Sequence, residues 1–101
     1  MSVNKILLYG KVTKSTCIQL ADKHYMINFL LCVSDGYGDR VSFDYFRCKK
    51  RNPEYLLVKE NSFVIVVGKM KQRSYVDKDK EVKYIWEVLV EEMTFSGVAP
   101  V

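Results

Sequence analysis

The chain has 101 residues, a length that allows one domain with a real core and leaves little material for a second. Apolar residues make up 49% of it and charged residues 28%, with a formal net charge of +4. Charges interrupt every stretch of about eighteen residues, which excludes a membrane-spanning helix, and the first residues lack the layout of a secretory signal. We therefore expect a cytoplasmic protein, and the modest positive charge alone indicates an acidic partner only weakly.

The cysteines, Cys17, Cys32 and Cys48, are odd in number and stand about fifteen residues apart. This spacing suits neither a disulfide framework nor paired zinc knuckles, so free and mostly buried thiols are predicted. No nucleotide fingerprint or metal-ligand spacing occurs, and the single histidine, His24, has no recognisable catalytic partners near it. The sequence therefore predicts no catalytic residue, no metal and no other cofactor.

The first predicted strand covers residues 4–12. Its alternation places one set of residues on one face and Lys5, Leu7, Tyr9 and Lys11 on the other. The centre of this strand is apolar on both faces and therefore requires cover on two sides. A domain of this size seldom supplies both layers, so a partner subunit is a reasonable source of the second.

Two further strands are predicted at residues 25–33 and 40–48, separated by a glycine-containing turn at residues 34–39. In the third strand, Phe43, Tyr45 and Arg47 share one face. A single aromatic residue on a strand often belongs to the core, but Arg47 beside Tyr45 favours the surface for that ring. Asn52, Pro53 and Glu54 then predict the start of a short helix that ends near residues 59–61.

The last two strands form a hairpin with a basic and aromatic run, residues 69–75, before a charged turn at residues 77–80 and a strand at residues 82–90. Lys69, Lys71 and Arg73 alternate and therefore project to one face. Such lysines can simply protect the edge of a sheet. Cations that alternate with an aromatic ring can also bind a single-stranded nucleic acid, because the cations pair with its phosphates and the ring stacks on its unpaired bases. We favour this second interpretation.

Three strands, a short helix and two strands predict an all-β protein, a five-stranded OB-fold Greek-key barrel with a short helix between strands three and four. Residues 1–95 are expected to form this domain, and residues 96–101 a disordered tail. OB-folds usually bind oligonucleotides or oligosaccharides.

Several segments, in register, match one known family. They are residues 3–12 (VNKILLYGKV), 28–33 (NFLLCV), 43–45 (FDY), 68–75 (GKMKQRSY), and Glu87-Val88 with residues 93–95. With these segments the sequence resembles the bacterial single-stranded DNA-binding proteins over roughly residues 3–95. The resemblance implies a non-enzymatic protein that binds single-stranded DNA without sequence preference, in replication, recombination or repair, as a homotetramer or homodimer in the nucleoid region of the cytoplasm.

The resemblance also implies roles for individual residues. Tyr45 and Tyr75 occupy positions where this family stacks rings on bases, and Tyr37 lies in a loop where another such ring is common. Trp86 either stacks a base or caps the barrel. The expected nucleic-acid contacts are Lys11, Tyr37, Arg40, Tyr45, Arg47, Lys49, Arg51, Lys69, Lys71, Arg73, Tyr75 and Trp86. Self-association is expected through Lys5, Leu7, Tyr9 and Phe46, although Phe46 also suits the core.

The sequence departs from the family at three places. The loop at residues 34–40 is short, Arg51 stands about where another stacking ring is expected, and no Gly/Pro/Gln-rich tail or acidic tip follows residue 95. Either the chain is shortened or it is a tailless member, like the primosomal replication protein N relatives and some mobile-element versions. An adaptor that bridges replication proteins and binds DNA weakly is therefore the second hypothesis. A preference for DNA over RNA, and for a dimer over a tetramer, stays open.

Overall fold

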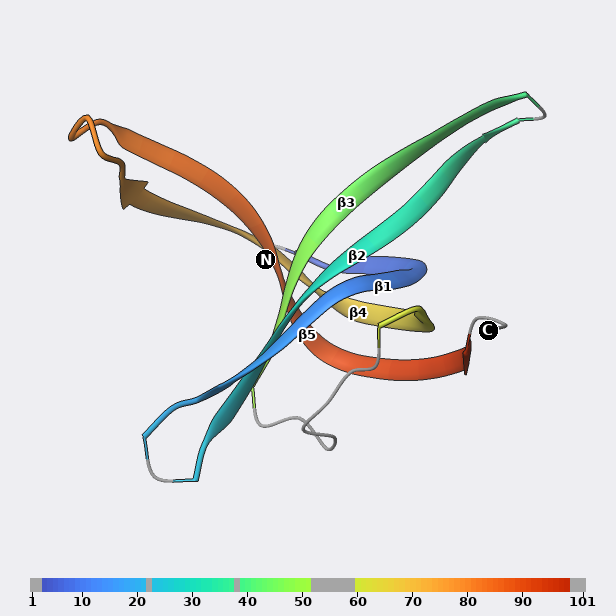
Figure 1. Cartoon of the computed structure of the whole chain (residues 1–101), viewed down its shortest axis with the longest axis horizontal. Coiled ribbons are helices and arrows are strands. Elements are labelled where there is room, and N and C mark those ends of the chain that lie inside the picture. The colour runs from blue at the N-terminus through green and yellow to red at the C-terminus, as the bar shows by residue number, and fades with distance from the viewer. Residues whose placement is uncertain (1–2, 22, 38, 52–59, 99–101) are drawn as a thin grey trace.

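The computed structural model describes residues 3–21, 23–37, 39–51 and 60–98, with the backbone alone for Tyr37, Gly97 and Val98. The described chain is all β, a closed barrel with the strand order β1-β2-β3-β5-β4 (Figure 1). The predicted OB-fold barrel is therefore confirmed, whereas most of the predicted helix, residues 52–59, lies outside the described residues. The strands are β1 (Ile6–Gln19), β2 (Tyr25–Tyr37), β3 (Arg40–Arg51), β4 (Ser62–Val76) and β5 (Val82–Val98).

The predicted alternation of faces is confirmed in the barrel. Leu8 and Val12 of β1 point into the core, whereas Leu7 and Tyr9 are exposed. Each Å² of apolar surface that these side chains bury lowers the free energy of the folded state by roughly 25 cal/mol. The inward residues therefore provide the main stabilisation. The buried apolar residues are Leu8, Val12, Ile27, Phe29, Leu31, Cys48, Val64, Val66, Val88 and Val90.

Four strands are longer than the sequence predicts. β1 continues past residue 12 to Gln19, β2 to Tyr37, β3 to Arg51 and β5 to Val98. Backbone pairing with a neighbouring strand, rather than an apolar face, maintains these extensions, as in the pair Gln19 and Tyr25. Val98 pairs with Ser62, so the predicted disordered tail does not begin at residue 96, and residues 99–101 lie outside the described part.

Hairpins extend from the barrel in different directions (Figure 1). The β2–β3 arm comprises residues 33–44 and the β4–β5 arm residues 70–88. The parallel contact between β3 and β5 has only two residue pairs, Cys48 with Val88 and Lys49 with Leu89. The two arms therefore diverge directly after the barrel closes (Figure 1).

The turn at the tip of the β4–β5 arm confirms the predicted charged turn. Asp77 Oδ1 accepts hydrogen bonds from the backbone amides of Asp79, at 2.9 Å, and Glu81, at 3.0 Å. Lys80 adopts a φ of 62°, in the left-handed region. An aspartate that bonds to backbone amides beyond itself is a common way to close such a turn.

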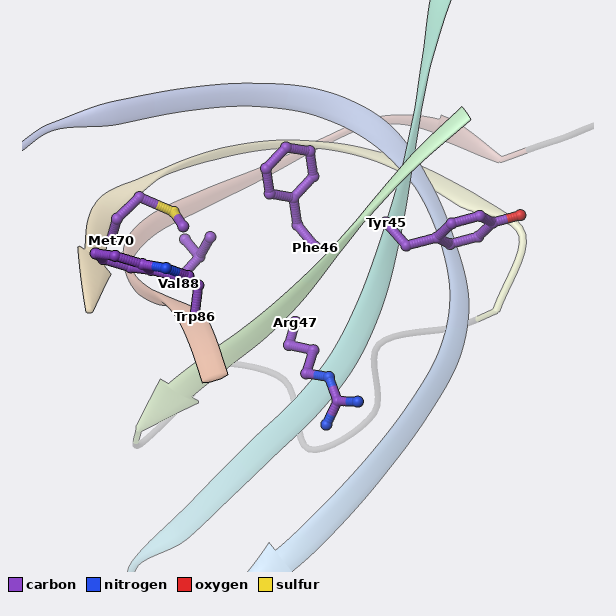
Figure 2. A pocket seen from close by; sticks show the side chains of 6 residues that line it. All are labelled: Tyr45, Phe46, Arg47, Met70, Trp86 and Val88. Carbon is purple, nitrogen blue, oxygen red and sulfur yellow. The ribbon is translucent and has the colours of Figure 1, made fainter. Parts of the chain in front are cut away.

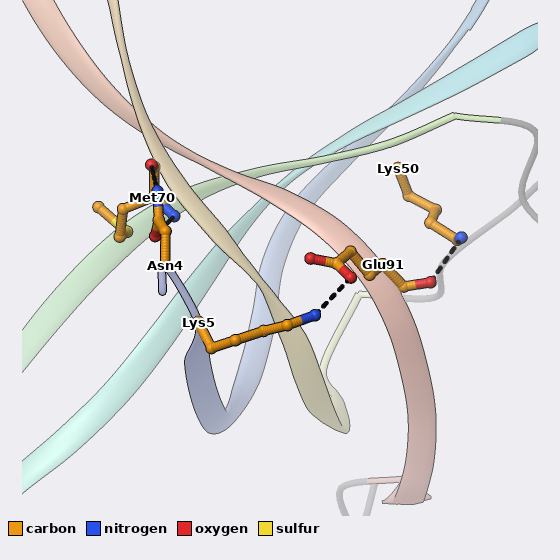
Figure 3. A network of polar contacts seen from close by, with 5 residues as sticks. All are labelled: Asn4, Lys5, Lys50, Met70 and Glu91. Carbon is orange, nitrogen blue, oxygen red and sulfur yellow. Dashed lines mark hydrogen bonds and ion pairs between the residues drawn. The ribbon is translucent and has the colours of Figure 1, made fainter. Parts of the chain in front are cut away.

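The segment before β1 is tied to β4 and β5 (Figure 3). Asn4 Nδ2 donates to the carbonyl oxygen of Met70 at 2.8 Å, and the Met70 amide donates to Asn4 Oδ1 at 3.2 Å. Lys5 Nζ lies 2.6 Å from Glu91 Oε2, and Lys50 Nζ donates to the carbonyl oxygen of Glu91 at 3.1 Å. The hydrogen bond from Lys5 lowers the pKa of Glu91 below its usual value. The Asn4 contacts fix β4 where it leaves the barrel for the arm, and the two lysines hold β5 at Glu91.

The three cysteines are free, as predicted, but they are not mostly buried. Cys17 is exposed, Cys32 is half-buried and Cys48 is buried in the core. Cys17 lies in the extension of β1 beyond the barrel, where fewer strands cover it. Burial raises the pKa of the Cys48 thiol to about 12, so this group stays protonated.

No helix among the described residues has the length and apolar character that crossing a bilayer requires.

Gly68 lies at a register shift between Val67 and Gly68 in the pairing of β4 with β5. A Cβ atom at this position would lie 2.2 Å from the carbonyl oxygen of Leu89, so the backbone would have to move. We expect Gly68→Ala to lower the free energy of unfolding by about 2 kcal/mol or more, measured by urea denaturation. Ser74→Ala, at an exposed position on the arm, is the control and should change it little; equal stability of the two variants would contradict the prediction.

Candidate nucleic-acid interface

The register of the sheet places the predicted contact residues of β1, β2 and β3 on one surface. Residues that pair across antiparallel strands project to the same side of a sheet. Cys32 pairs with both Lys11 and Tyr45, and Leu30 pairs with both Lys14 and Arg47. Two rows of side chains therefore cross these strands, and each row contains a cation.

The same surface continues across β5 and β4. Leu89 pairs with both Lys49 and Lys69, Lys71 pairs with Glu87, and Tyr75 pairs with Lys83. We use the name outer face for this surface. Its cationic and tyrosine side chains include Lys11, Lys14, Tyr45, Arg47, Lys49, Arg51, Lys69, Lys71, Arg73 and Tyr75.

The two tyrosine rings of the outer face that were predicted to stack on bases are accessible. Tyr45 is 59% exposed and Tyr75 is 45% exposed, which contradicts a core role for Tyr45. The Cys32 thiol, which is the cross-strand neighbour of Tyr45, raises the pKa of its phenol. The ring of Tyr45 thus lies beside β2, while its exposed surface can still meet a ligand.

A buried carboxylate lies in the middle of the outer face. Glu87 is 4% exposed, and its Oε2 lies 2.8 Å from Lys49 Nζ while its Oε1 accepts a hydrogen bond from Arg73 Nε. Burial by itself would raise the pKa of Glu87, but the hydrogen bonds from Lys49 and Arg73 outweigh it and lower the pKa. Glu87 is therefore ionised, and it holds two cations from separate strands together.

Two depressions flank this ion triad of Lys49, Arg73 and Glu87. One has a volume of about 450 Å³ and is also lined by Lys14, Thr16, Asn28 and Arg47, among others. The other has a volume of about 420 Å³ and is also lined by residues that include Arg51, Lys71 and Leu89. Since the triad lines both, the two depressions adjoin and form one basic groove across the sheet.

The sequence interpretation missed Lys14 and Glu87. Lys14 follows a register shift between Val12 and Lys14, which changes the alternation of β1 and turns Lys14 toward the outer face. The segment beyond residue 12 has no apolar alternation that would have indicated a strand there. Glu87 has partners on β3 and β4, and no local pattern reveals which strands adjoin β5.

Other predicted residues lie away from the outer face. Arg40 pairs with Tyr37 at the tip of the β2–β3 arm and projects to the side opposite Tyr45, because the two residues are an odd number of positions apart on one strand. Trp86 pairs with Gln72 and projects to the side opposite Tyr75. The side chain of Tyr37 lies outside the described part. Arg40 and Trp86 therefore do not share the outer face with Tyr45 and Tyr75, and their role as nucleic-acid contacts stays a prediction.

The residues predicted for self-association lie in different environments. Leu7 is 70% exposed, and Tyr9 is exposed with its ring stacked on Phe63 at a centroid distance of 5.9 Å. Lys5 forms the ion pair with Glu91, and Phe46 packs against the barrel core. Leu7 and Tyr9 adjoin apolar residues of β4 on the same face. We call this surface the β1 patch, and it consists of Leu7, Tyr9, Phe63, Ile65 and Val67.

A five-stranded barrel in this order, with cations and accessible rings over one face of the sheet, is an OB-fold of the type that accommodates single strands. The sequence model of the Single-strand binding protein family matches residues 3–96, and the chain belongs to this family.

Proteins similar to this chain include one known from its sequence and one with a solved structure. A protein of Staphylococcus epidermidis, named "Single-stranded DNA-binding protein", is 25% identical over 92% of this chain and 76% of its own length. A solved structure, "Plasmodium falciparum SSB complex with ssDNA", superposes with a TM-score of 0.80 at 21% identity, and covers 94% of this chain and 96% of that chain. The second similarity supports the fold.

The ion triad predicts how stability depends on pH. Because the pKa of Glu87 is lower in the folded protein than the ordinary value of about 4.3, its ion pairs stabilise the fold above that value. This contribution should be lost as the pH falls through the lowered pKa. At neutral pH we expect Glu87→Gln to lower the free energy of unfolding by about 2 kcal/mol, measured by urea denaturation.

The difference between wild type and Glu87→Gln should shrink as the solution is acidified. Glu92→Gln is the matched control, since Glu92 is exposed and forms no ion pair among the described residues. A Glu87→Gln variant as stable as wild type at neutral pH would show that the triad contributes nothing to the fold.

Proposed function

We propose that this protein binds single-stranded DNA without sequence preference and protects it during replication, recombination or repair. One observation carries the proposal: cations from β1, β3 and β4 share the outer face with the exposed rings of Tyr45 and Tyr75. The family of the chain and the names of its relatives support the same function.

The proposed mechanism has two parts. Lys14, Arg47 and Lys71 line the basic groove and neutralise backbone phosphates, which releases condensed counterions into solution. Tyr45 and Tyr75 stack on bases, and each such contact is worth about 1 to 3 kcal/mol. Neither part reads a base edge, so the binding is tolerant of sequence.

The protein acts in this proposal as a non-enzymatic binding protein of the nucleoid and cytoplasm, without a metal or cofactor. Binding and protection of a strand require no chemical step. The alternative, an adaptor that bridges replication proteins and binds DNA weakly, is not favoured, because the chain belongs to the Single-strand binding protein family and its Staphylococcus epidermidis relative is named a single-stranded DNA-binding protein.

Binding should depend steeply on salt. If five or six phosphates are neutralised, the logarithm of the binding constant for oligo-dT should fall with the logarithm of salt concentration at roughly −0.7 per contact. We expect Lys71→Ala to reduce this slope by about 0.7, and Tyr75→Ala to weaken binding by about 5-fold to 150-fold with the slope unchanged. Fluorescence anisotropy of a labelled oligonucleotide would measure both quantities.

The control is Lys78→Ala, which removes an exposed lysine from the hairpin turn outside the groove. It should retain the wild-type slope and affinity. A wild-type slope near zero would exclude phosphate neutralisation, and tolerance of both Lys71→Ala and Tyr75→Ala would support the adaptor instead.

We also propose that copies of the chain associate through the β1 patch. Leu7, Tyr9 and Ile65 expose apolar area side by side on paired strands, and an unshielded apolar patch of this kind commonly marks a protein interface. The stacked rings of Tyr9 and Phe63 give the patch a flat surface that suits a symmetric contact.

Leu7→Asp places a charge in this patch, and burying it in an interface would be costly. We expect the molecular mass measured by light scattering to fall to that of a smaller assembly or the monomer. Val41→Asp changes an equally apolar, exposed residue on the β2–β3 arm and should leave the mass unchanged. Wild-type mass in the Leu7→Asp variant would exclude the patch as the interface.

A further inference from the structure

A hollow of about 560 Å³ lies where the two arms diverge, between β3 and β5 (Figure 2). It begins directly beyond the pair of Cys48 and Val88, at which the contact between the two strands ends. Its lining combines aromatic, aliphatic and cationic side chains, namely Tyr45, Phe46, Arg47, Met70, Trp86 and Val88.

The walls of the hollow are apolar and rest on the barrel core. Val88 is fully buried, and Phe46 and Met70 are half-buried and packed against the core. Figure 2 shows Trp86 beside Met70 and Val88 with Phe46 across from them, whereas the ring of Tyr45 points away. A flat group that entered the hollow would therefore meet carbon and ring surfaces.

Trp86 does not cap the barrel. A side chain that closed the core would be buried as Val88 is, but Trp86 is 56% exposed. The register turns it away from the side of the sheet that carries Tyr75, because it pairs with Gln72 whereas Lys71 pairs with Glu87. The indole is thus an accessible stacking surface that the outer face does not use.

Arg47 connects the hollow with the basic groove. It lines both the hollow and the depression that contains Lys14 and Lys49. A phosphate chain that follows this groove therefore passes the mouth of the hollow, and its unpaired bases are free to turn out of the chain. A cation beside the mouth favours a nucleotide over an apolar side chain of another protein.

We propose that this hollow is a subsite for one nucleobase of the bound single strand, an inference that rests on the proposed function. Trp86 provides the stacking surface, Phe46 and Met70 the walls, and Arg47 the contact to the adjoining phosphate. The subsite lies on the opposite side of the β4–β5 arm from Tyr75, so the strand would contact both sides of this arm.

The protein reports on this subsite directly, because Trp86 is its single tryptophan. Saturating oligo-dT should quench the Trp86 emission of the wild-type protein and protect the indole from acrylamide. An abasic oligonucleotide of the same length keeps the phosphates and should bind without either effect. Bound oligo-dT that leaves the emission and the acrylamide quenching unchanged would overturn the subsite, as would equal effects of the abasic strand.

Substitutions give a second test. Trp86→Leu should weaken oligo-dT binding by about 5-fold to 150-fold and leave the affinity for the abasic strand unchanged. Tyr84→Leu, an exposed ring on the same strand and face that does not line the hollow, should bind as wild type does. Trp86→Phe should recover most of the affinity.

Each other outcome overturns the subsite. Wild-type affinity of Trp86→Leu, an equal loss with Tyr84→Leu, or a change in assembly mass without a change in affinity would exclude a base in the hollow. If Trp86→Leu does not fold, the wild-type fluorescence decides. A wild-type protein that binds neither oligonucleotide would contradict the proposed function itself, which distinguishes the two failures.

Discussion

The short parallel contact between β3 and β5 is the constraint on which the rest of the structure depends. Its two residue pairs close the barrel, and they bring Lys49 of β3 beside Glu87 of β5. Where the contact ends, the arms separate and a hollow opens beside Val88. A longer contact would extend the sheet and fill that space. Without any contact between β3 and β5, the barrel would stay open and Glu87 would lack one of its cations.

The ion triad shows how a binding surface can carry a buried negative charge. A carboxylate removed from water is costly unless it is paired and hydrogen-bonded, and Glu87 meets this condition through Lys49 and Arg73. In return, two long cationic side chains are held in the centre of the groove. The groove thus has two paired cations in the triad, and further cations such as Lys14 and Arg51 line the depressions beside it.

The β4–β5 arm presents different chemistry on its two sides. One side carries Lys71, Arg73 and Tyr75, and the other carries Trp86 above apolar walls. Strand geometry produces this division, because successive residues alternate between the faces. An arm that leaves the barrel keeps both faces accessible, whereas a strand within the barrel loses one face to the core.

The sequence alone determined the barrel class, the inward faces of the strands and most cations of the outer face, because alternation is a local property that survives folding. Residues such as Tyr45, Arg47 and Lys71 could be assigned in this way. Only the tertiary structure decided which strands are neighbours, and hence that Glu87 pairs with Lys49 and that Arg47 borders a hollow with Trp86. It also revealed the register shift that turns Lys14 outward, since contacts between distant segments leave no periodic pattern in the chain.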